Sequence, residues 1–270
     1  MKIISVVGYK KSGKTSLVER LVTELRKHGK VGTIKHMHEH DLNTEGSDTW
    51  RHAKAGALVV VGVTPKQLVK FSKGELADAL NELADAGMDF GVVEGFKEST
   101  LPKIVLGDIK AKNIVGRWES AEHADINEII DIVLKLPEYH TLKSLIKKVR
   151  SHPEIDKAGA IGSFTGIVRG VTANLQTQFL EFEEYSELAK QKMEEICSEL
   201  KEKEGIVEVV MHHRTGILYK GEDIVYVVVA ASHRKQLFPV LMEAIERLKR
   251  EVPIWKKEHT LEGEWWVHEK

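Results

Sequence analysis

The sequence has one cysteine, few aromatic residues and almost no net charge. The single cysteine, Cys197, excludes an internal disulfide, so we expect a protein of the reducing cytoplasm. No run of about 18 apolar residues is present, and we therefore expect no membrane-spanning helix. The apolar stretch near the N-terminus is too short for a signal peptide. With a net charge of −1, nothing in the overall charge favours nucleic acid as a partner.

The rest of the composition is that of a folded protein. Hydrophobic residues make up 42% and charged residues 30% of the 270 positions, which is enough apolar material for a packed core. This length corresponds to one large domain or to two domains of ordinary size. The sequence pattern changes near Pro137. We therefore predict one domain over residues 1–137 and a second over residues 138–270.

The first half alternates apolar runs of strand length with helical patterns. Predicted strands lie at 2–8, 31–36, 56–62, 88–96, 103–107 and 112–118. Predicted helices lie at 14–29, 74–87 and 125–136. Strands that alternate with helices predict an α/β domain with a mostly parallel sheet.

The second half pairs strands between long helices. Predicted strands lie at 158–170, 177–185, 206–214 and 223–232. Predicted helices lie at 141–151, 186–205 and 233–252. This order predicts a compact α+β domain, so the chain as a whole has an α/β P-loop domain followed by an α+β domain.

The segment GYKKSGKT, residues 8–15, begins at the last residue of the first predicted strand. It has the spacing G-x-x-x-x-G-K-[ST]. The segment follows an apolar strand and begins an amphipathic helix, the context in which this pattern binds phosphate. Its glycines let the backbone curve around a phosphate, and the helix N-terminus adds positive potential. Lys14 would reach the β- and γ-phosphates, and the Thr15 hydroxyl would ligate Mg²⁺. The predicted nucleotide-binding residues are Gly8, Lys11, Ser12, Gly13, Lys14 and Thr15. The alternative is a glycine-rich turn with a surface lysine.

Two acidic residues are candidates for the magnesium site. Glu94 ends the apolar run FGVVEG, where P-loop proteins carry such an acid, and Asp48 is the second candidate. For Glu94 the alternative is a strand-terminal charge without function. His36, His38 and His40 would share one face of a strand, which is compatible with a metal. Because no cysteine or clear fourth ligand accompanies them, we favour a polar loop lining the nucleotide cleft. No [NT]-K-x-D motif follows a strand, so the sequence leaves the base open.

Several segments occur in the order typical of one family. GYKKSGKTSL, TIKHMHEHD, GSDTWRHAKAGA and VVEGFK with a later LPKIV resemble the MobB family, the molybdopterin-guanine dinucleotide biosynthesis protein B. The resemblance covers roughly residues 1–135. It implies an α/β protein, usually dimeric, that binds GTP with Mg²⁺ and assists the attachment of a nucleotide to molybdopterin. It also implies the nucleotidyltransferase MobA as a partner.

The segment LKREVPIWKKE, residues 248–258, places lysines on both sides of an apolar elbow. Lys249 ends a predicted helix that Pro253 cannot continue, so the chain must turn. The turn can bring Lys249 and Lys256 to one region, with Trp255 packed beneath them. Two ammonium groups in a partly dry pocket can bind an anion or act as a nucleophile or an acid–base pair. The alternative is a solvated helix end, where lysines favour the helix dipole.

Other cations follow strands elsewhere in the second half. Arg169 ends the run FTGIVR, and His233 and Arg234 lie where the run IVYVVVAAS gives way to a helix. His213 and Arg214 end another predicted strand. Cations gathered at strand ends favour a pocket for a phosphorylated or carboxylated ligand.

The segments FTGIVRG, LEFEEYSELA, HHRTGILYKGEDIVYVVVAASHR and LKREVPIWKKE together resemble the MoaE family, the large catalytic subunit of molybdopterin synthase. The resemblance covers about residues 140–270. It implies conversion of cyclic pyranopterin monophosphate into molybdopterin, with sulfur supplied by the C-terminal thiocarboxylate of a small ubiquitin-like subunit of the MoaD type. It implies that Lys249 and Lys256 are catalytic, that Arg169, His233 and Arg234 bind the pterin phosphate, and that the protein forms a homodimer.

The sequence thus predicts a fusion of two activities of molybdenum cofactor biosynthesis. Two other hypotheses are a P-loop kinase or fast GTPase whose second domain binds its substrate, and a non-enzymatic, nucleotide-gated carrier of molybdopterin. Cys197 lies near Met193 and Ile196 in a helical pattern, so we expect a core residue and not a sulfur carrier. Trp265 and Trp266 lack a surrounding basic patch, and we expect them to pack or pair subunits.

Overall fold

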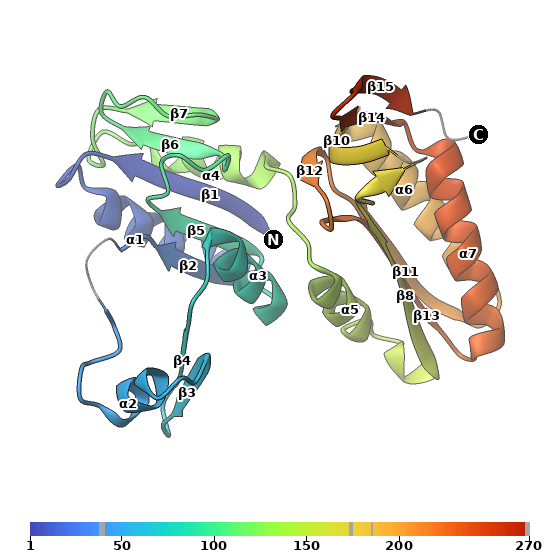
Figure 1. The fold of residues 1–270 in the computed structure, drawn as a ribbon, viewed down its shortest axis with the longest axis horizontal. Coiled ribbons are helices and arrows are strands. Elements are labelled where there is room, and N and C mark those ends of the chain that lie inside the picture. The colour runs from blue at the N-terminus through green and yellow to red at the C-terminus, as the bar shows by residue number, and fades with distance from the viewer. Residues whose placement is uncertain (38–40, 173–174, 185, 268–270) are drawn as a thin grey trace. The chain divides into compact units, whose positions relative to one another are not determined.

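The computed structural model describes residues 1–37, 41–172, 175–184 and 186–267. The chain divides into two compact units, Met1–Thr141 and Leu142–Lys270 (Figure 1). Residues just beyond Pro137 belong to the first unit. The Tyr139 hydroxyl donates a hydrogen bond of 2.6 Å to the Asn81 side chain, and Thr141 donates one to Asp85. We keep the proposal that the functional domains comprise residues 1–137 and 138–270.

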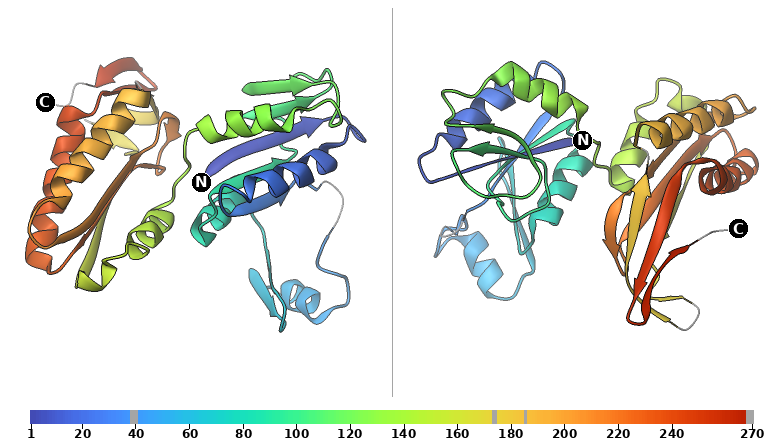
Figure 2. Two further views of the ribbon diagram at one scale, coloured as in Figure 1. Left: turned by 180° about the vertical axis from the view of Figure 1, so that it is seen from behind. Right: turned by 90° about the horizontal axis from the view of Figure 1, so that it is seen from above.

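The first unit has a five-stranded parallel sheet in the order β2-β5-β1-β6-β7. Its strands are β1 (Lys2–Gly8), β2 (Val31–Lys35), β5 (Phe90–Glu94), β6 (Lys103–Leu106) and β7 (Ile114–Trp118). Its long helices are α1 (Lys14–Leu25), α3 (Leu76–Ala86) and α4 (Ile126–Lys135). Helices α1 and α4 cover one face of the sheet, and α3 covers the other (Figure 2). The buried side chains of these helices pack against the sheet. The prediction of a parallel α/β domain is confirmed.

One predicted strand of this sheet lies elsewhere. The run at 56–62 contributes to β3 (Val59–Val63), which pairs antiparallel with β4 (Leu68–Ser72) in a separate hairpin next to the short helix α2 (Asp48–Lys54). The exposure of β3 explains why the predicted place of this strand was wrong. Val59, Val61 and Val63 are exposed, and of these four valines only Val60 is buried. A central parallel strand is buried on both faces, whereas this one is covered on one face only.

The second unit has antiparallel sheets. One sheet has the order β11-β13-β8, and the other has the order β12-β10-β14-β15 with β9 beside β10. The strands are β8 (Ala160–Ile167), β9 (Val171–Thr172), β10 (Leu175–Glu184), β11 (Ile206–His213), β12 (Gly216–Tyr219), β13 (Asp223–Ala231), β14 (Ile254–Thr260) and β15 (Gly263–Val267). The helices are α5 (Leu142–Arg150), the short 3₁₀ helix η1 (Ile155–Lys157), α6 (Ser186–Lys201) and α7 (Arg234–Glu251).

The three-stranded sheet is covered on both faces. Side chains of α6 and α7 pack with Val227, Val229 and Ala231 of β13. Side chains of α5 pack with the residues between them, Val228 and Ala230. Alternate residues of a strand point to opposite faces, so β13 is apolar throughout, as its sequence indicates. The predicted α+β domain is confirmed.

Candidate functional site

The predicted phosphate-binding loop joins β1 to α1. Lys11 and Gly13 have left-handed backbone angles, with φ of 68° and 84°. A Cβ atom on Gly13 would lie 2.6 Å from Cβ of Ala121, so only glycine fits there. Ser12 Oγ is buried and has no hydrogen-bond partner among the residues that the structure describes. The loop is therefore a tight, polar cradle directly before a helix N-terminus, as an anion site requires.

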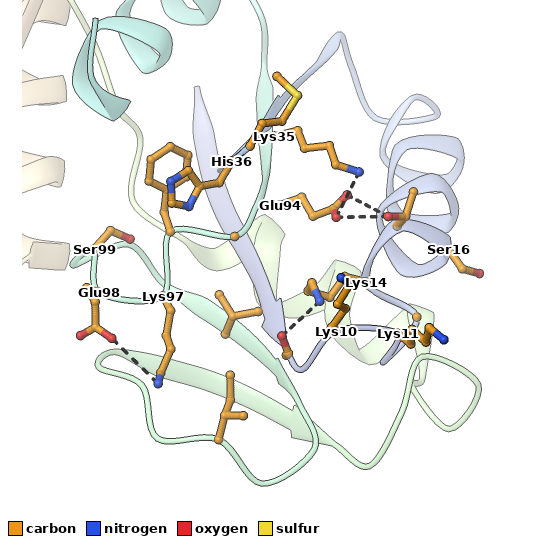
Figure 3. A pocket seen from close by; sticks show the side chains of 18 residues that line it. Lys10, Lys11, Lys14, Ser16, Lys35, His36, Glu94, Lys97, Glu98 and Ser99 are labelled. Atoms are coloured by element: carbon orange, nitrogen blue, oxygen red, sulfur yellow. Dashed lines mark hydrogen bonds and ion pairs between the residues drawn. The ribbon is translucent and has the colours of Figure 1, made fainter. Parts of the chain in front are cut away.

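Three side chains position charge at this loop (Figure 3). Lys14 Nζ lies inside the loop, where it donates to the carbonyl oxygens of Gly8 at 3.1 Å and Tyr9 at 2.6 Å. Thr15 Oγ1 donates to the Glu94 carboxylate, at 3.1 Å from each oxygen. Lys35 Nζ lies 3.4 Å from the same carboxylate. The first helical turn of α1 thus faces the carboxyl ends of β2 and β5.

These groups line a cleft of about 1060 Å³ at the carboxyl edge of the parallel sheet. Ligands of open α/β sheets bind at this edge. The lining residues include the lysines Lys10, Lys11, Lys14, Lys35 and Lys97, the carboxylates Glu94 and Glu98, and the aromatic residues His36 and Phe96. The cleft is therefore predominantly cationic and large enough for a nucleoside triphosphate.

The residues present match a magnesium nucleotide. Hydroxyl and carboxylate oxygens are the protein ligands that Mg²⁺ prefers, and Thr15 and Glu94 bring such oxygens together. Asp48, the other acidic candidate, does not line the cleft. Its exposed carboxylate lies 3.7 Å from Arg51 on α2. His36 lines the cleft, whereas His38 and His40 lie outside the described residues. Within the described ranges, no group of three His, Cys, Asp or Glu side chains can hold a metal ion.

The predicted lysine elbow forms at the end of α7. The helix ends at Glu251, and Val252 adopts an extended conformation because Pro253 follows it. Strand β14 then begins at Ile254. Lys249 thus lies in the last turn of α7, and Lys256 lies two residues into β14, opposite Phe182 of β10.

Trp255 does not pack beneath Lys256, contrary to the prediction. Its side chain is 43% exposed. Trp255 and Lys256 are consecutive residues of a strand, so their side chains point to opposite faces. Lys257 faces away from Lys256 for the same reason, and it pairs with Glu264 at 2.5 Å. Of the two lysines in β14, the elbow therefore places Lys256, and not Lys257, on the face shared with Phe182.

The other predicted cations lie at opposite ends of the unit. Arg169 follows β8, whose end pairs with the beginning of β13, and α7 runs antiparallel to β13. Arg169 and Lys249 therefore lie at the same end of the sheet. His233 and Arg234 lie at the N-terminus of α7, roughly 22 Å from Lys249 by the rise of the helix. One copy of the chain does not bring all five predicted residues together.

An ion network fixes the end of α7 that carries Lys249. Arg247 donates to both oxygens of Glu251 at 3.0 Å and lies 2.7 Å from Glu199 on α6. Arg250 also donates to Glu251. These hydrogen bonds, that from Arg247 first, lower the pKa of Glu251 to about 2.

Glu251→Gln is expected to lower the melting temperature at pH 7. The change removes a carboxylate whose charged form is stabilised in the folded state by hydrogen bonds from Arg247 and Arg250. A depressed pKa contributes stability above the unfolded pKa and loses it as pH falls through the folded pKa. The difference from wild type should therefore shrink between about pH 4.5 and pH 2. Thermal unfolding followed by circular dichroism measures it, with the exposed Glu246→Gln as the control. A difference that does not change with pH would contradict this account.

Two further side chains bear on the chemistry. Burial raises the pKa of Cys197 to about 12, and the thiol packs with the core of α6 and α7. The prediction of a core cysteine is confirmed.

Lys35 and Phe96 line the cleft but were not assigned a role from the sequence. Lys35 is the last residue of β2, and Phe96 follows the end of β5. These positions could have predicted a place in the cleft, since the carboxyl ends of parallel strands meet at one edge of the sheet. No helix in the described part of the chain is long and apolar enough to cross a membrane.

Comparisons with known proteins divide the chain in the same way. Residues 3–126 match the family model for molybdopterin guanine dinucleotide synthesis protein B, MobB, and residues 138–251 match the model for the MoaE protein. A Haloferax volcanii protein named "Probable molybdopterin synthase" is 34% identical over 273 residues, which cover 100% of both chains. The molybdopterin synthase catalytic subunit of Bacillus subtilis is 40% identical over 46% of this chain and 77% of its own length.

A solved structure, described as a MobB protein homolog from Bacillus stearothermophilus, is 27% identical over 50% of this chain and 99% of its own, with a TM-score of 0.39. The full-length similarity to the Haloferax protein and the two family matches decide the assignment. The chain belongs to the same family as that protein, joins a MobB domain to a MoaE domain, and functions in molybdenum cofactor biosynthesis.

Proposed function

We propose that the MoaE domain is the catalytic part of a molybdopterin synthase. Its substrate is cyclic pyranopterin monophosphate, and its sulfur donor is a MoaD-like subunit with a C-terminal thiocarboxylate. The observation that carries this proposal is the elbow after α7, which places Lys249 and Lys256 on either side of Pro253. Phosphate and thiocarboxylate are both anions, so cationic side chains at this end of the unit suit both reactants. The ammonium groups supply acid–base catalysis while sulfur is transferred.

The placement of the cations supports a site built from two copies of the chain. Lys249 and Arg169 lie at one end of the unit, and His233 and Arg234 lie at the other, roughly 22 Å away along α7. A twofold dimer that places the N-terminus of one α7 against the elbow of its partner brings all five residues to each of two sites. The homodimer is therefore part of the proposal.

Mixing two inactive variants is expected to restore activity if the site is shared. In a dimer of Lys249→Ala with Arg234→Ala, one site carries both changes and the other carries neither. Random exchange of subunits should thus restore about a quarter of wild-type activity, as twofold symmetry requires. The variants are mixed, dissociated and reassembled before assay. Two preparations of Lys249→Ala treated alike form the control, and no recovery despite proven exchange would exclude a shared site.

The MobB domain is proposed to bind GTP with Mg²⁺. Backbone N–H groups of the loop and Lys14 would hold the phosphates, while Thr15 and Glu94 would hold the metal ion. Bound GTP supplies the nucleotide group for attachment to molybdopterin. We propose MobA as the partner that catalyses the attachment and the cytoplasm as the compartment. We expect this domain to hydrolyse GTP slowly if at all, because it would position the nucleotide for a partner.

The function is tested with the purified full-length chain, cyclic pyranopterin monophosphate and a thiocarboxylated MoaD-like subunit. We expect molybdopterin, followed as its fluorescent oxidised derivative, and no product with a carboxylate-ended subunit. Binding of the pterin without turnover would instead support a carrier, and fast phosphate release from GTP on addition of a metabolite would support a kinase or GTPase.

A further inference from the structure

An aromatic pair lies at the β2–β5 side of the phosphate cleft. The rings of His36 and Phe96 are stacked, with centroids 4.2 Å apart and planes inclined by 16°. Both residues line the cleft, and His36 is labelled in Figure 3. Lys97 follows Phe96, is half exposed and lines the same cleft, with its ammonium 3.9 Å from the exposed Glu98 carboxylate. A flat aromatic surface beside a lysine suits a planar ring that carries an anionic group.

The backbone at this pair is held in an uncommon conformation. Phe96 has φ of 54°, which is rare for a bulky residue and marks functional sites. Gly95, with φ of 101°, allows close approach, because a Cβ atom there would lie 2.8 Å from Cβ of His36. The strained backbone conformation therefore occurs at Phe96, the residue that places an aromatic ring in the cleft.

Hydrogen bonds from a buried lysine hold the segment that follows Phe96. Lys103 is fully buried, and its ammonium donates to the carbonyl oxygens of Ser99 and Leu101, the latter at 2.9 Å. Phe96 packs against the apolar cluster that includes Val93 and Leu80. The aromatic pair and Lys97 therefore belong to a supported segment, as a binding surface requires.

The pair lies in the same cleft as the proposed magnesium ligands. Thr15 and Glu94, the proposed magnesium ligands, mark the position of the β- and γ-phosphates, and Phe96 is two residues beyond Glu94. The base is at the other end of a nucleoside triphosphate. With the magnesium at Thr15 and Glu94, the stacked rings would lie nearer the terminal phosphates than the base, where a second molecule could bind. Five lysines against two carboxylates in the lining leave positive charge for a second anion.

We propose that the MobB cleft has a second subsite, in which a phosphorylated planar heterocycle of the pterin class binds at the stacked His36–Phe96 pair and Lys97, next to the nucleotide phosphates. Its choice of a pterin rests on the proposed function, because the MoaE domain forms a phosphorylated pterin. The subsite gives the chain a place to hold that product beside GTP, separate from the site where it is made.

Pterin stoichiometry tests the proposal. The probe is 6-hydroxymethylpterin phosphate, whose ring fluoresces, in equilibrium dialysis against the full-length chain with a non-hydrolysable GTP analogue and Mg²⁺. We expect two molecules per wild-type chain and one per Arg169→Ala chain. Lys97→Ala and Phe96→Leu should each weaken the second class at least about tenfold, the usual effect of losing a stacking or phosphate contact. Lys97 is exposed, so its variant does not put folding at risk.

The control is Lys66→Ala, an exposed lysine in the turn between β3 and β4, which should keep two pterins per chain. One pterin per wild-type chain that Arg169→Ala removes would overturn the proposal, as would a second class unaffected by both cleft variants. Retention of the second class when the chain binds no GTP would count against the nucleotide proposal alone. A single class that depends on Lys97 and not on Arg169 would support the subsite and count against the MoaE assignment of Arg169.

Discussion

Lys249→Ala is expected to reduce molybdopterin formation at least about a hundredfold, since a positioned acid–base group contributes 10²- to 10⁴-fold. Lys249 lies in the exposed last turn of α7, where truncation opens no core cavity. Its ammonium is proposed to act on the pterin and on the thiocarboxylate, so both binding and turnover should fall. Initial rates of product formation at saturating partner measure the loss.

The neighbouring residue offers a matched control for this variant. Arg250→Ala removes a cation one position along the helix, which pairs with Glu251 and is not proposed to touch substrate. It should keep most of the activity. Nucleotide binding should be unchanged in both variants. Substantial residual synthase activity in Lys249→Ala would remove the elbow from the catalytic assignment, and an equal loss in Arg250→Ala would point to a structural effect.

Lys14→Ala is expected to weaken GTP binding about a hundredfold while leaving the synthase reaction unaffected. The ammonium donates to the carbonyl oxygens of Gly8 and Tyr9 within the loop, and its loss removes the cation that is placed to contact the β- and γ-phosphates. Charge-assisted contacts of this type exceed neutral hydrogen bonds about twofold in strength. Isothermal titration with GTP in the presence of Mg²⁺ measures the change.

Lys27→Ala is the control for nucleotide binding. It removes a lysine beyond the far end of α1, where the side chain pairs with Glu24, and it should bind GTP as wild type does. The dependence of GTP affinity on Mg²⁺ should disappear in Thr15→Ala. A Lys14→Ala chain with unchanged affinity would show that the loop is only a turn before α1.

The sequence carried enough information for the first site because its signals are local. The loop spacing, the strand before it and the helix after it are contiguous, and Glu94 ends a visible apolar run. Parallel strands then place their carboxyl ends together without further information. Lys35 and Phe96 were missed because their roles depend on which strands are neighbours, and β2 and β5 are far apart in sequence.

The second site shows where such reasoning stops. Pro253 predicts the elbow, because a proline ends a helix by its own chemistry. The separation of His233 from Lys249 is already implied by the helix predicted at 233–252, which α7 matches. That Trp255 would lie on the other face depends on the strand that follows. The hairpin of β3 and β4 is a similar case, since an apolar run does not itself reveal how many of its faces are covered.

The buried thiol of Cys197 has a practical consequence for observing sulfur in this system. With a pKa raised to about 12, the thiol is almost entirely protonated at neutral pH, and the thiolate is the form that alkylating reagents attack. The chain has no other cysteine. A thiol-directed fluorophore added to samples withdrawn from the reaction should therefore label the remaining thiocarboxylate of the partner and spare this chain, so that consumption of the sulfur donor can be measured at each time point.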